Sequence, residues 1–195
     1  MTRTKSILLA TCIAIALPWR PLPLNAATIT TGKQPDGGPT VYFSGDIDNE
    51  SVAKFGEIIL RIARHNVFVY LESAGGNVEA ALSMAGMIKI VTAQTVVTKH
   101  CASMCAVVWL AGSPRWVVSG AHIGFHAAYL SDEDGNNLGV SPGGNAIIGA
   151  FLGKLGYSNE TIRRLTETDP ESMYWLTRET AKELGIEAKI IEPKR

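Results

Sequence analysis

A single serine lies between two cysteines in the segment Lys99–Gly112, KHCASMCAVVWLAG, which continues into an apolar run. A serine beside a buried segment needs a hydrogen-bond partner or a chemical role, because a buried unpaired hydroxyl is costly. Gly75 and Gly76 follow another apolar run, and His126 ends the segment HIGFH. Together with Ser103, these residues could supply an oxyanion hole, a nucleophile and a general base.

Each of these features also has a purely structural explanation. A glycine pair before a helix is commonly a turn, a serine at a helix start is commonly an N-cap, and a histidine in a strand is commonly a satisfied structural group. Their order and spacing together are more specific, because all three lie at or near the ends of expected strands, where parallel α/β sheets place active sites. The segment around Ser103 lacks the glycines of the G-x-S-x-G motif, which argues against an α/β-hydrolase.

The elements that would position these residues alternate along the chain. Apolar runs predict strands at 40–47, 67–73, 95–99, 115–120 and 122–129, and periodic patterns predict helices at 49–65, 78–91, 102–112, 145–156, 158–167 and 177–186. Residues 130–144 are polar and rich in glycine, which predicts a long loop. Strands that alternate with helices indicate an α/β domain with mostly parallel strands.

The N-terminal residues predict a cleaved leader. Arg3 and Lys5 precede an uncharged apolar run at 7–17, and small residues follow at Ala26 and Ala27, which is the pattern of a secretory signal peptide. The run is shorter than the roughly 20 residues that span a bilayer, so a retained membrane anchor is the less favoured alternative. We therefore expect a signal peptide at 1–27, a flexible stretch at 28–38, one domain at 39–195 and a periplasmic or secreted protein.

The charge balance argues against nucleic acid as a partner. The chain has 18 basic and 18 acidic residues, and the leader removes Arg3, Lys5 and Arg20, so the mature protein has 15 basic and 18 acidic residues and a net charge of −3. A surface that binds nucleic acid needs a basic stripe. We expect no membrane contact after the leader is removed.

Cys101 and Cys105 are the cysteines that remain, since Cys12 lies in the leader. Four residues apart on a helix, their Cα atoms would lie about 6 Å apart, near the upper end of disulfide geometry, and a sharp turn would bring them closer. The sequence leaves two alternatives: the cysteines form a disulfide that braces the turn at Ser103, or they are two buried thiols. Two ligands without a second pair make a poor zinc site, so we expect no metal and no other cofactor.

The segments VYLESAGGNVEAALSMAGMIK, TVVTKHCASMCAVVWLAG and HIGFHAAY resemble the proteolytic subunit of Clp protease. They resemble more closely its exported bacterial relatives, the Clp-like periplasmic proteins. The resemblance runs from about Val41 to Ile190 and implies one domain with the α/β ClpP/crotonase fold, a ββα spiral. The cysteines are a departure, because cytosolic Clp subunits have no such pair beside the nucleophile.

The resemblance also implies a role for each candidate site residue. Ser103 corresponds to the family's nucleophile and His126 to its catalytic histidine, and the amides of Gly76 and Met104 correspond to its oxyanion hole. His122 falls where the family has a non-catalytic residue. Both histidines would share one face of a strand, so geometry alone does not separate them.

The third member of a catalytic triad is a second departure from the family. Counting forward from Ile162 places Asp169 on the family's aspartate, whereas counting back from the C-terminal helix places Met173 there. A four-residue insertion, PESM, reconciles the two counts and favours Asp169, with Glu171 second. The structural alternative for Asp169 is a solvated loop acid before Pro170. Loss of the orienting acid can lower turnover roughly 10⁴-fold.

The resemblance implies an exported serine hydrolase, specifically a serine protease that forms an acyl-enzyme and acts on peptides or unfolded polypeptides. A catalytically weak or inactive binding or assembly module of the same fold is the alternative. Acyl-CoA chemistry fits poorly, because an exported protein does not normally meet CoA. A homo-oligomer is also expected, since the segment after His126 corresponds to the family's ring contact and contains an apolar helix, AIIGAFLGKL.

Overall fold

An eight-stranded sheet runs through the part of the chain that the structure, a computed structural model, describes: residues 26–62, 66–132 and 136–192. Its strands follow the order β1-β2-β3-β4-β5-β10, while β6 pairs with β4 and β9 pairs with β6. The strands are β1 (Thr28–Lys33), β2 (Pro39–Ser44), β3 (Phe68–Ser73), β4 (Gln94–Ala102), β5 (Arg115–Val118), β6 (His122–Phe125), β9 (Tyr174–Trp175) and β10 (Lys189–Ile191).

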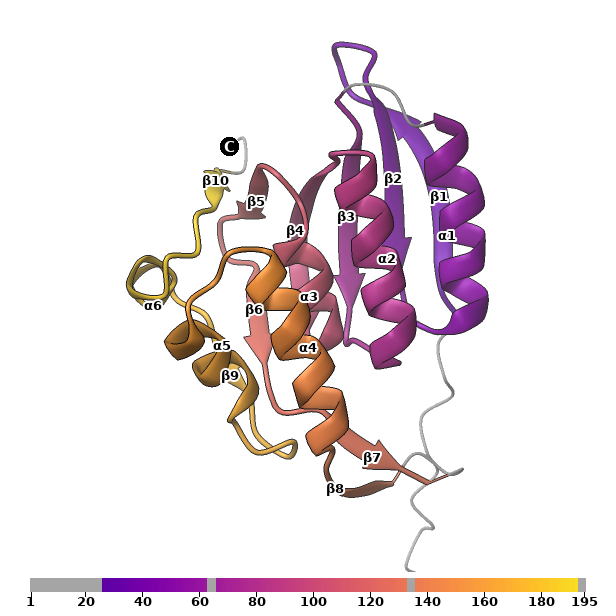
Figure 1. Ribbon diagram of the computed structural model, residues 1–195. Helices are drawn as coiled ribbons and strands as arrows, with labels where there is room; N and C mark the ends of the chain where they lie inside the picture. The colour runs from indigo at the N-terminus through magenta and orange to yellow at the C-terminus, as the bar shows by residue number, and fades with distance from the viewer. Residues whose placement is uncertain (1–25, 63–65, 133–135, 193–195) are drawn as a thin grey trace, which may run out of the picture.

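Helices cover one face of this sheet, with α1, α2 and α3 packed side by side and α4 and α5 beyond them (Figure 1). Apolar residues of the central strands and of these helices form a single buried core. The helices are α1 (Asn49–Ile62), α2 (Val78–Ile90), α3 (Met104–Leu110), α4 (Pro142–Lys154), α5 (Asn159–Thr166) and α6 (Arg178–Glu183).

Strand β4 is the central strand and has two partners on one side. Its residues Thr95–Val97 pair with β5, and its residues His100–Ala102 pair with β6. Strands β2, β3, β4 and β6 are joined by parallel pairing, so β3, β4 and β6 all end at the same edge of the sheet. The expected α/β domain with mostly parallel strands is confirmed. Its topology places the ends of β3, β4 and β6 next to one another.

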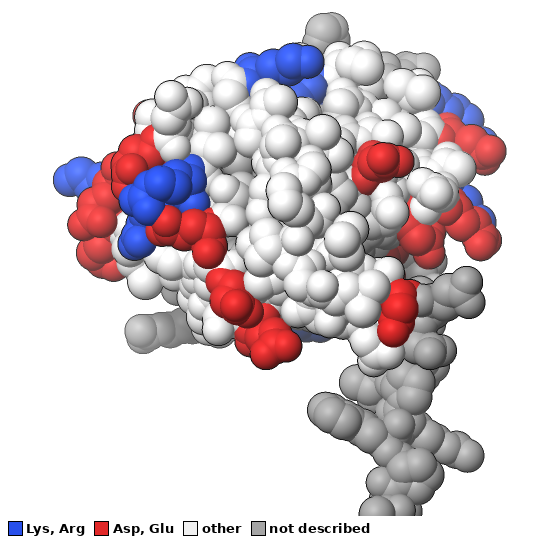
Figure 2. Space-filling view, turned by 60° about the horizontal axis from the view of Figure 1, so that its bottom comes forward, with Lys and Arg blue, Asp and Glu red and all other residues white. Residues whose placement is uncertain are grey.

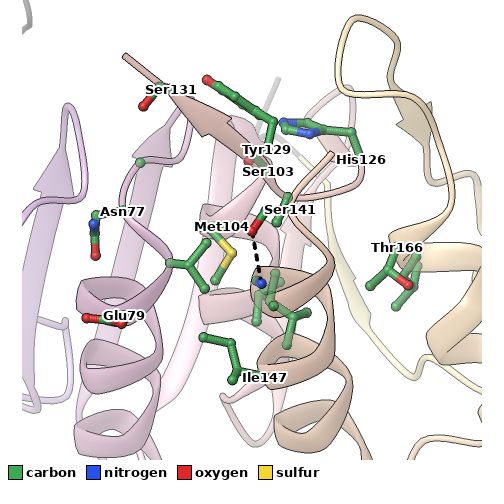
Figure 3. Close-up of a pocket in the computed structure, with 18 of the residues that line it drawn as sticks. Asn77, Glu79, Ser103, Met104, His126, Tyr129, Ser131, Ser141, Ile147 and Thr166 are labelled. Carbon is green, nitrogen blue, oxygen red and sulfur yellow. Dashed lines mark hydrogen bonds between the residues drawn. The ribbon is translucent and has the colours of Figure 1, made fainter. Parts of the chain in front are cut away.

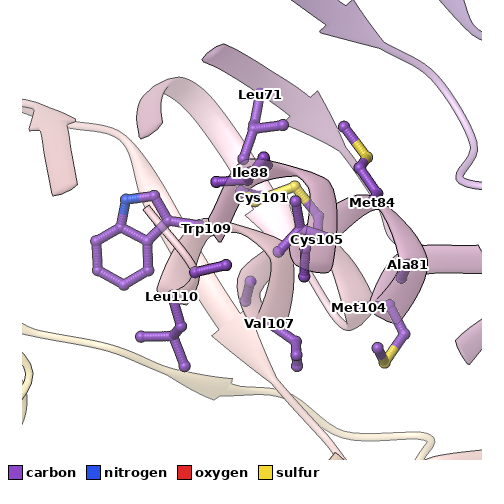
Figure 4. Packing of buried hydrophobic residues seen from close by; sticks show 14 of the residues in the cluster. Leu71, Ala81, Met84, Ile88, Cys101, Met104, Cys105, Val107, Trp109 and Leu110 are labelled. Atoms are coloured by element: carbon purple, nitrogen blue, oxygen red, sulfur yellow. A yellow bond between two sulfur atoms is a disulfide. The ribbon is translucent and has the colours of Figure 1, made fainter. Parts of the chain in front are cut away.

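Helix α3 is buried on every side, and side-chain hydrogen bonds fix its C-terminal end (Figure 4). Near its C-terminal end, the hydroxyl of Thr95 donates to the backbone oxygen of Trp109 at 2.8 Å, and the Trp109 indole donates to the oxygen of Trp116 at 3.3 Å. These bonds satisfy polar groups that would otherwise be unpaired in the core. The helix that carries the candidate nucleophile at its start is therefore immobilised at its far end.

The prediction of a flexible stretch at 28–38 is wrong for its first half. Residues Thr28–Lys33 form β1, which pairs antiparallel with β2 from Thr28 opposite Ser44 to Lys33 opposite Pro39. The sequence TITTGK begins with four β-branched residues, which favour a strand. The domain therefore begins at β1 rather than at residue 39.

Two other expectations need correction. The predicted loop at 130–144 contains a hairpin of β7 (Tyr129–Ser131) and β8 (Asn137–Val140), whose polar and glycine-rich composition conceals short strands. The predicted helix at 102–112 begins at Met104, because β4 continues to Ala102 and pairs there with β6. The strand-to-helix change therefore falls on Ser103 itself.

The predicted signal peptide lies almost entirely outside the described residues. Within the described ranges, no helix is both long and apolar enough to cross a bilayer.

Two glycine-to-alanine substitutions should change stability in opposite directions. A Cβ on Gly112 would lie 2.1 Å from the Thr95 hydroxyl, so Gly112→Ala should lower the free energy of unfolding by about 1–3 kcal/mol through overpacking. A Cβ on Gly86, inside α2, would meet no atom within 4 Å, so Gly86→Ala should raise it by up to about 1 kcal/mol. Urea denaturation followed by circular dichroism measures both, and equal effects of the two changes would contradict this description of the core.

Candidate active site

A cavity of about 780 Å³ opens beside the strand ends, between the start of α2 and the start of α4. Ser103, Met104, His126 and Gly76 all line it (Figure 3). Gly76 follows β3, Ser103 follows β4 and His126 follows β6, so the sheet topology brings them together. The structure thus groups every predicted member of the nucleophile, base and oxyanion hole around one space.

Ser103 has a backbone conformation that side-chain-bearing residues rarely adopt. Its φ is 55° and its ψ is −128°, at the sharp turn from β4 into α3. Such a conformation costs about 1–3 kcal/mol and persists where the surroundings enforce it. The Ser103 amide donates to the oxygen of Gly124 at 2.9 Å, which ties the turn to β6. The side chain is half-buried and borders the cavity.

The loop of Gly75 and Gly76 is fixed by backbone bonds to one residue, Ile47. The Ile47 amide donates to Gly75 at 2.8 Å, and the Ile47 oxygen accepts from Asn77 at 2.8 Å. Both glycines have positive φ, 114° and 142°, and a Cβ on Gly76 would lie 2.2 Å from the Ile47 oxygen. Only glycine fits at position 76.

The amides of Gly76 and Met104 are free to bind an oxyanion. Neither has a hydrogen-bond acceptor among the described residues. The two loops also touch, since a Cβ on Gly75 would lie 2.7 Å from the Ser103 Cβ and 3.1 Å from the Met104 nitrogen. Two unpaired amides beside a serine are what an oxyanion hole requires.

His126 is held by a backbone carbonyl. Its Nδ1 lies 2.7 Å from the oxygen of Ala127, and its ring lies 5.9 Å from that of Tyr129. A carbonyl oxygen only accepts, so Nδ1 carries the hydrogen in this contact and the neutral ring leaves Nε2 unprotonated. Ala127 is itself fixed, because its amide donates to the oxygen of Thr168 at 2.7 Å. The ring therefore has the tautomer that a general base needs.

The structure separates the two histidines that the sequence pattern left together. His122 is exposed at the start of β6, where its ring lies 5.9 Å from that of Trp175, and it is not among the residues that line the cavity. His126 follows the last residue of β6 and turns into the cavity (Figure 3). His126 therefore reaches the site because it follows the end of β6, whereas His122 lies at the other end of the strand.

Asp169 does not complete a triad in this structure. Its carboxylate accepts from the amide of Glu171 at 2.8 Å, its backbone oxygen accepts from Ser172 at 2.8 Å, and the residue is exposed. Among the described residues, no hydrogen bond joins it to His126. An aspartate before a proline commonly starts a turn, and Asp169 has that role here.

The other two residues weighed for this role do not reach the histidine either. Glu171 lies in the same turn and is exposed. Met173 packs on β6, where a Cβ on Gly124 would lie 2.6 Å from its side chain. The insertion therefore puts a solvated turn and a thioether where an orienting acid was expected.

Cys101 and Cys105 form a disulfide with sulfurs 2.00 Å apart and Cα atoms 5.2 Å apart. Both residues are fully buried. Of the two alternatives that the sequence left open, the structure has the bonded pair rather than two thiols. Across the described residues, no group of three or more His, Cys, Asp or Glu side chains is arranged to hold a metal ion.

Several residues of the cavity wall were not anticipated from the sequence. They come from the start of α2, the β7–β8 hairpin, the cap of α4 and the end of α5: Asn77, Glu79, Tyr129, Ser131, Ser141 and Thr166 (Figure 3). Among the described residues that line the cavity, Glu79 is the one carboxylate. The signal for Tyr129 and Ser131 was hidden because the hairpin has the composition of a polar loop.

The surface charge around this edge is mixed. Figure 2 shows a largely uncharged centre, with basic and acidic groups side by side towards its margins. On α5, Arg163 pairs with Glu160 at 2.6 Å and Arg164 pairs with Glu167 at 3.1 Å. This face shows no basic stripe of the kind that binds nucleic acid.

Comparison with known proteins finds similar sequences and structures. Residues 40–133 match the model of the Clp protease family. ClpP1 from Listeria monocytogenes is 24% identical, with 80% of this chain and 92% of that chain covered and a TM-score of 0.60. The ClpP protease catalytic domain from Plasmodium falciparum is 19% identical, with 79% and 85% covered and a TM-score of 0.60. Among curated proteins, none matches the sequence.

The fold and the matched segment define a mixed α/β domain of the ClpP type. Over residues 40–133 the chain is similar to the Clp protease family, and its fold is that of the ClpP structures. The matched segment contains Ser103 and His126 and ends before Asp169, which is also where the site departs from a complete triad.

The turn role of Asp169 predicts that its charge is dispensable for the reactivity of Ser103. Asp169→Asn keeps the turn acceptor, so the rate at which a fluorophosphonate labels Ser103 should change less than about threefold, as for other surface substitutions. Asp36→Asn is a matched control, because the Asp36 carboxylate likewise accepts from an amide two residues on, that of Gly38 at 2.9 Å. If the labelling rate fell by about 10⁴-fold in Asp169→Asn but not in Asp36→Asn, Asp169 would be a member of a catalytic triad after all.

Proposed function

We propose that this protein is an exported serine peptidase in which Ser103 is the nucleophile and His126 the general base. The observation that carries the proposal is the cavity that Ser103, His126 and the unpaired amides of Gly76 and Met104 share. The match of residues 40–133 to the Clp protease family supports the same chemistry.

The proposed reaction uses these groups in turn. Nε2 of His126 takes the Ser103 proton as the Ser103 oxygen bonds to a peptide carbonyl carbon, and the carbonyl oxygen becomes an oxyanion held by the amides of Gly76 and Met104. The intermediate collapses when the peptide C–N bond breaks and the leaving amine takes the proton from His126. Water then attacks the acyl-enzyme through the same base and releases the acid, so the enzyme is regenerated.

The cavity supports a polypeptide as substrate. One part of its wall is apolar, formed by Val107, Ile147, Ile148, Leu152 and Leu165. Polar groups line the rest, and the cavity is open at the edge of the sheet. A peptide or an unfolded segment could place a side chain against the apolar wall while its carbonyl lies beside Ser103.

A second candidate function is a weakly active or inactive binding module of the same fold. The placement of Asp169 in a solvated turn favours it, because His126 then lacks a carboxylate partner among the described residues. The intact arrangement of Ser103, His126 and the two amides favours the peptidase, which we take as the first proposal.

Fluorophosphonate labelling distinguishes these two functions. Ser103 should be labelled in the wild type, Ser103→Ala should not be labelled, and His126→Ala should be labelled at least about 100-fold more slowly, as expected for the loss of a general base. Mass spectrometry of the labelled peptide gives the site, and the time course gives the rate.

His122→Ala provides the matched control for this experiment. It removes an imidazole on the same segment that lies outside the cavity, so the labelling rate should stay near that of the wild type. A correctly folded wild type that refuses the probe would eliminate the peptidase proposal and leave the binding module.

Export is part of the same proposal and rests on the sequence of residues 1–27. The charged start, the apolar run and the small residues at Ala26 and Ala27 follow in the order of a secretory signal peptide. N-terminal sequencing of the protein recovered outside the cytoplasm should give a start near Ala27 or Thr28. Recovery of Met1 on a membrane-bound form would contradict export.

The β7–β8 hairpin supports a homo-oligomer. Leu130 and Leu138 on this hairpin are 55% and 63% exposed, with Tyr129 and Val140 beside them on the same strands. An exposed apolar cluster of this kind marks an association surface. Light scattering should give a mass above that of one chain, and Leu130→Asp with Leu138→Asp should reduce it to the monomer. Ile90 is the last residue of α2 and is 77% exposed, so Ile90→Asp should leave the mass of the oligomer unchanged. A monomeric wild type would contradict the proposal.

A further inference from the structure

Helix α3 begins without the side-chain cap that the other described helices have. The N-cap residue of α3 is Ser103, and its side chain makes no capping hydrogen bond. The residues that accept a hydrogen bond from the first turn of the other helices are Asp48 for α1, Asn77 for α2, Ser141 for α4, Ser158 for α5 and Thr177 for α6. The helix with the nucleophile is therefore the one whose start lacks this stabilisation.

The missing cap matters because the first turn of α3 is chemically important. The helix has 7 residues, and a short helix without a cap frays from its end. Its first residue, Met104, carries one of the two proposed oxyanion amides, and the residue before it has the unfavourable φ of 55°. Fraying of one turn would displace the nucleophile and an oxyanion donor together.

The disulfide spans this turn. Cys101 lies in β4 between Ser73 of β3 and Ile123 of β6, so the sheet fixes its position. Cys105 is the second residue of α3. The bond between them encloses the three residues Ala102, Ser103 and Met104, and it lies in the packed core beneath them (Figure 4).

We infer that Cys101 and Cys105 are positioning residues: their disulfide replaces the missing cap of α3 and holds Ser103 and the Met104 amide in the reactive arrangement. This inference rests on the proposed function and adds that Ser103 reacts efficiently only in the oxidised protein. A misplacement of about 1 Å in a reacting group can slow a reaction by roughly 100-fold, so a small movement of this turn suffices.

Because the disulfide is buried, it must form before the chain is fully folded, and the reactivity of Ser103 is set at that stage. Both cysteines are 0% exposed, so a thiol reagent does not reach the bond in the folded protein. The bond is therefore made as the chain folds, in a compartment that permits disulfides. A chain that folds in a reducing compartment has the same fold and a poorly reactive Ser103.

The test compares two redox forms of one sequence. The mature wild-type protein is unfolded and refolded either in a glutathione redox buffer or in excess reductant, and mass spectrometry after alkylation counts the free thiols. Circular dichroism and thermal unfolding establish that each form is folded, and the fluorophosphonate labelling rate is measured well below each midpoint. The reduced form should be labelled at least about tenfold more slowly, and unfolding it and refolding it in the redox buffer should restore the rate.

Two variants separate positioning from general stability. Cys101→Ala with Cys105→Ala should reproduce the slow labelling of the reduced form, whichever of the two buffers it is refolded in. Ile59→Ala removes a fully buried side chain of α1 that does not line the cavity, so it should lower the midpoint of unfolding while the folded protein is labelled at the wild-type rate.

The outcomes are distinct from those that test the proposed function. Oxidised wild type that is not labelled at Ser103 rejects the peptidase and the inference together. Equal labelling of the oxidised form and of a folded reduced form or double variant rejects the inference alone. If neither the reduced form nor the double variant folds, the disulfide is a requirement of the whole fold and the inference is also rejected.

Discussion

Ser103 connects the last residue of a central strand to the first residue of a buried helix, and this connection constrains the rest of the site. Its φ of 55° is unfavourable for any residue with a Cβ, so the surroundings must hold it. The constraint comes from the bond of the Ser103 amide to Gly124, from the close approach of Gly75, and from the disulfide below. Each of these neighbours belongs to a different strand end, so the turn is stable only when the sheet is complete.

The split pairing of β4 explains how one sheet serves this turn. The first half of β4 pairs with β5, and the second half pairs with β6. The shift from one partner to the other brings the end of β6, and therefore His126, beside the end of β4. The Gly75–Gly76 loop reaches the same place from the other side, because β3 pairs with β4 along its length. Nucleophile, base and oxyanion amides thus depend on three pairings of a single strand.

Much of this arrangement could be predicted from the sequence, because the informative residues are local. The apolar run before Gly75, the small residues around Ser103 and the position of His126 predicted which groups lie near strand ends, although the strands beside Ser103 and His126 end at Ala102 and Phe125 rather than at 99 and 129. The extension of β4 beyond Lys99 to Ala102 could not be predicted, because the apolar pattern ends at polar Lys99 and His100, and the pairing of His100–Ala102 with β6 continues the strand. The same holds for β1 and the β7–β8 hairpin, whose residues are half-exposed or exposed and carry little apolar periodicity.

The role of Asp169 could not be predicted for a different reason. A count along the chain assigns a residue to a position, but an insertion beside it changes which backbone reaches the histidine. Here the backbone of Thr168 binds Ala127, and the oxygen of Ala127 binds His126. A neutral carbonyl fixes the tautomer as a carboxylate would, yet it stabilises the imidazolium that forms during acyl transfer less, because it carries no full negative charge. The peptidase and the weakly active module therefore share one geometry and differ in the charge opposite Nδ1 of His126.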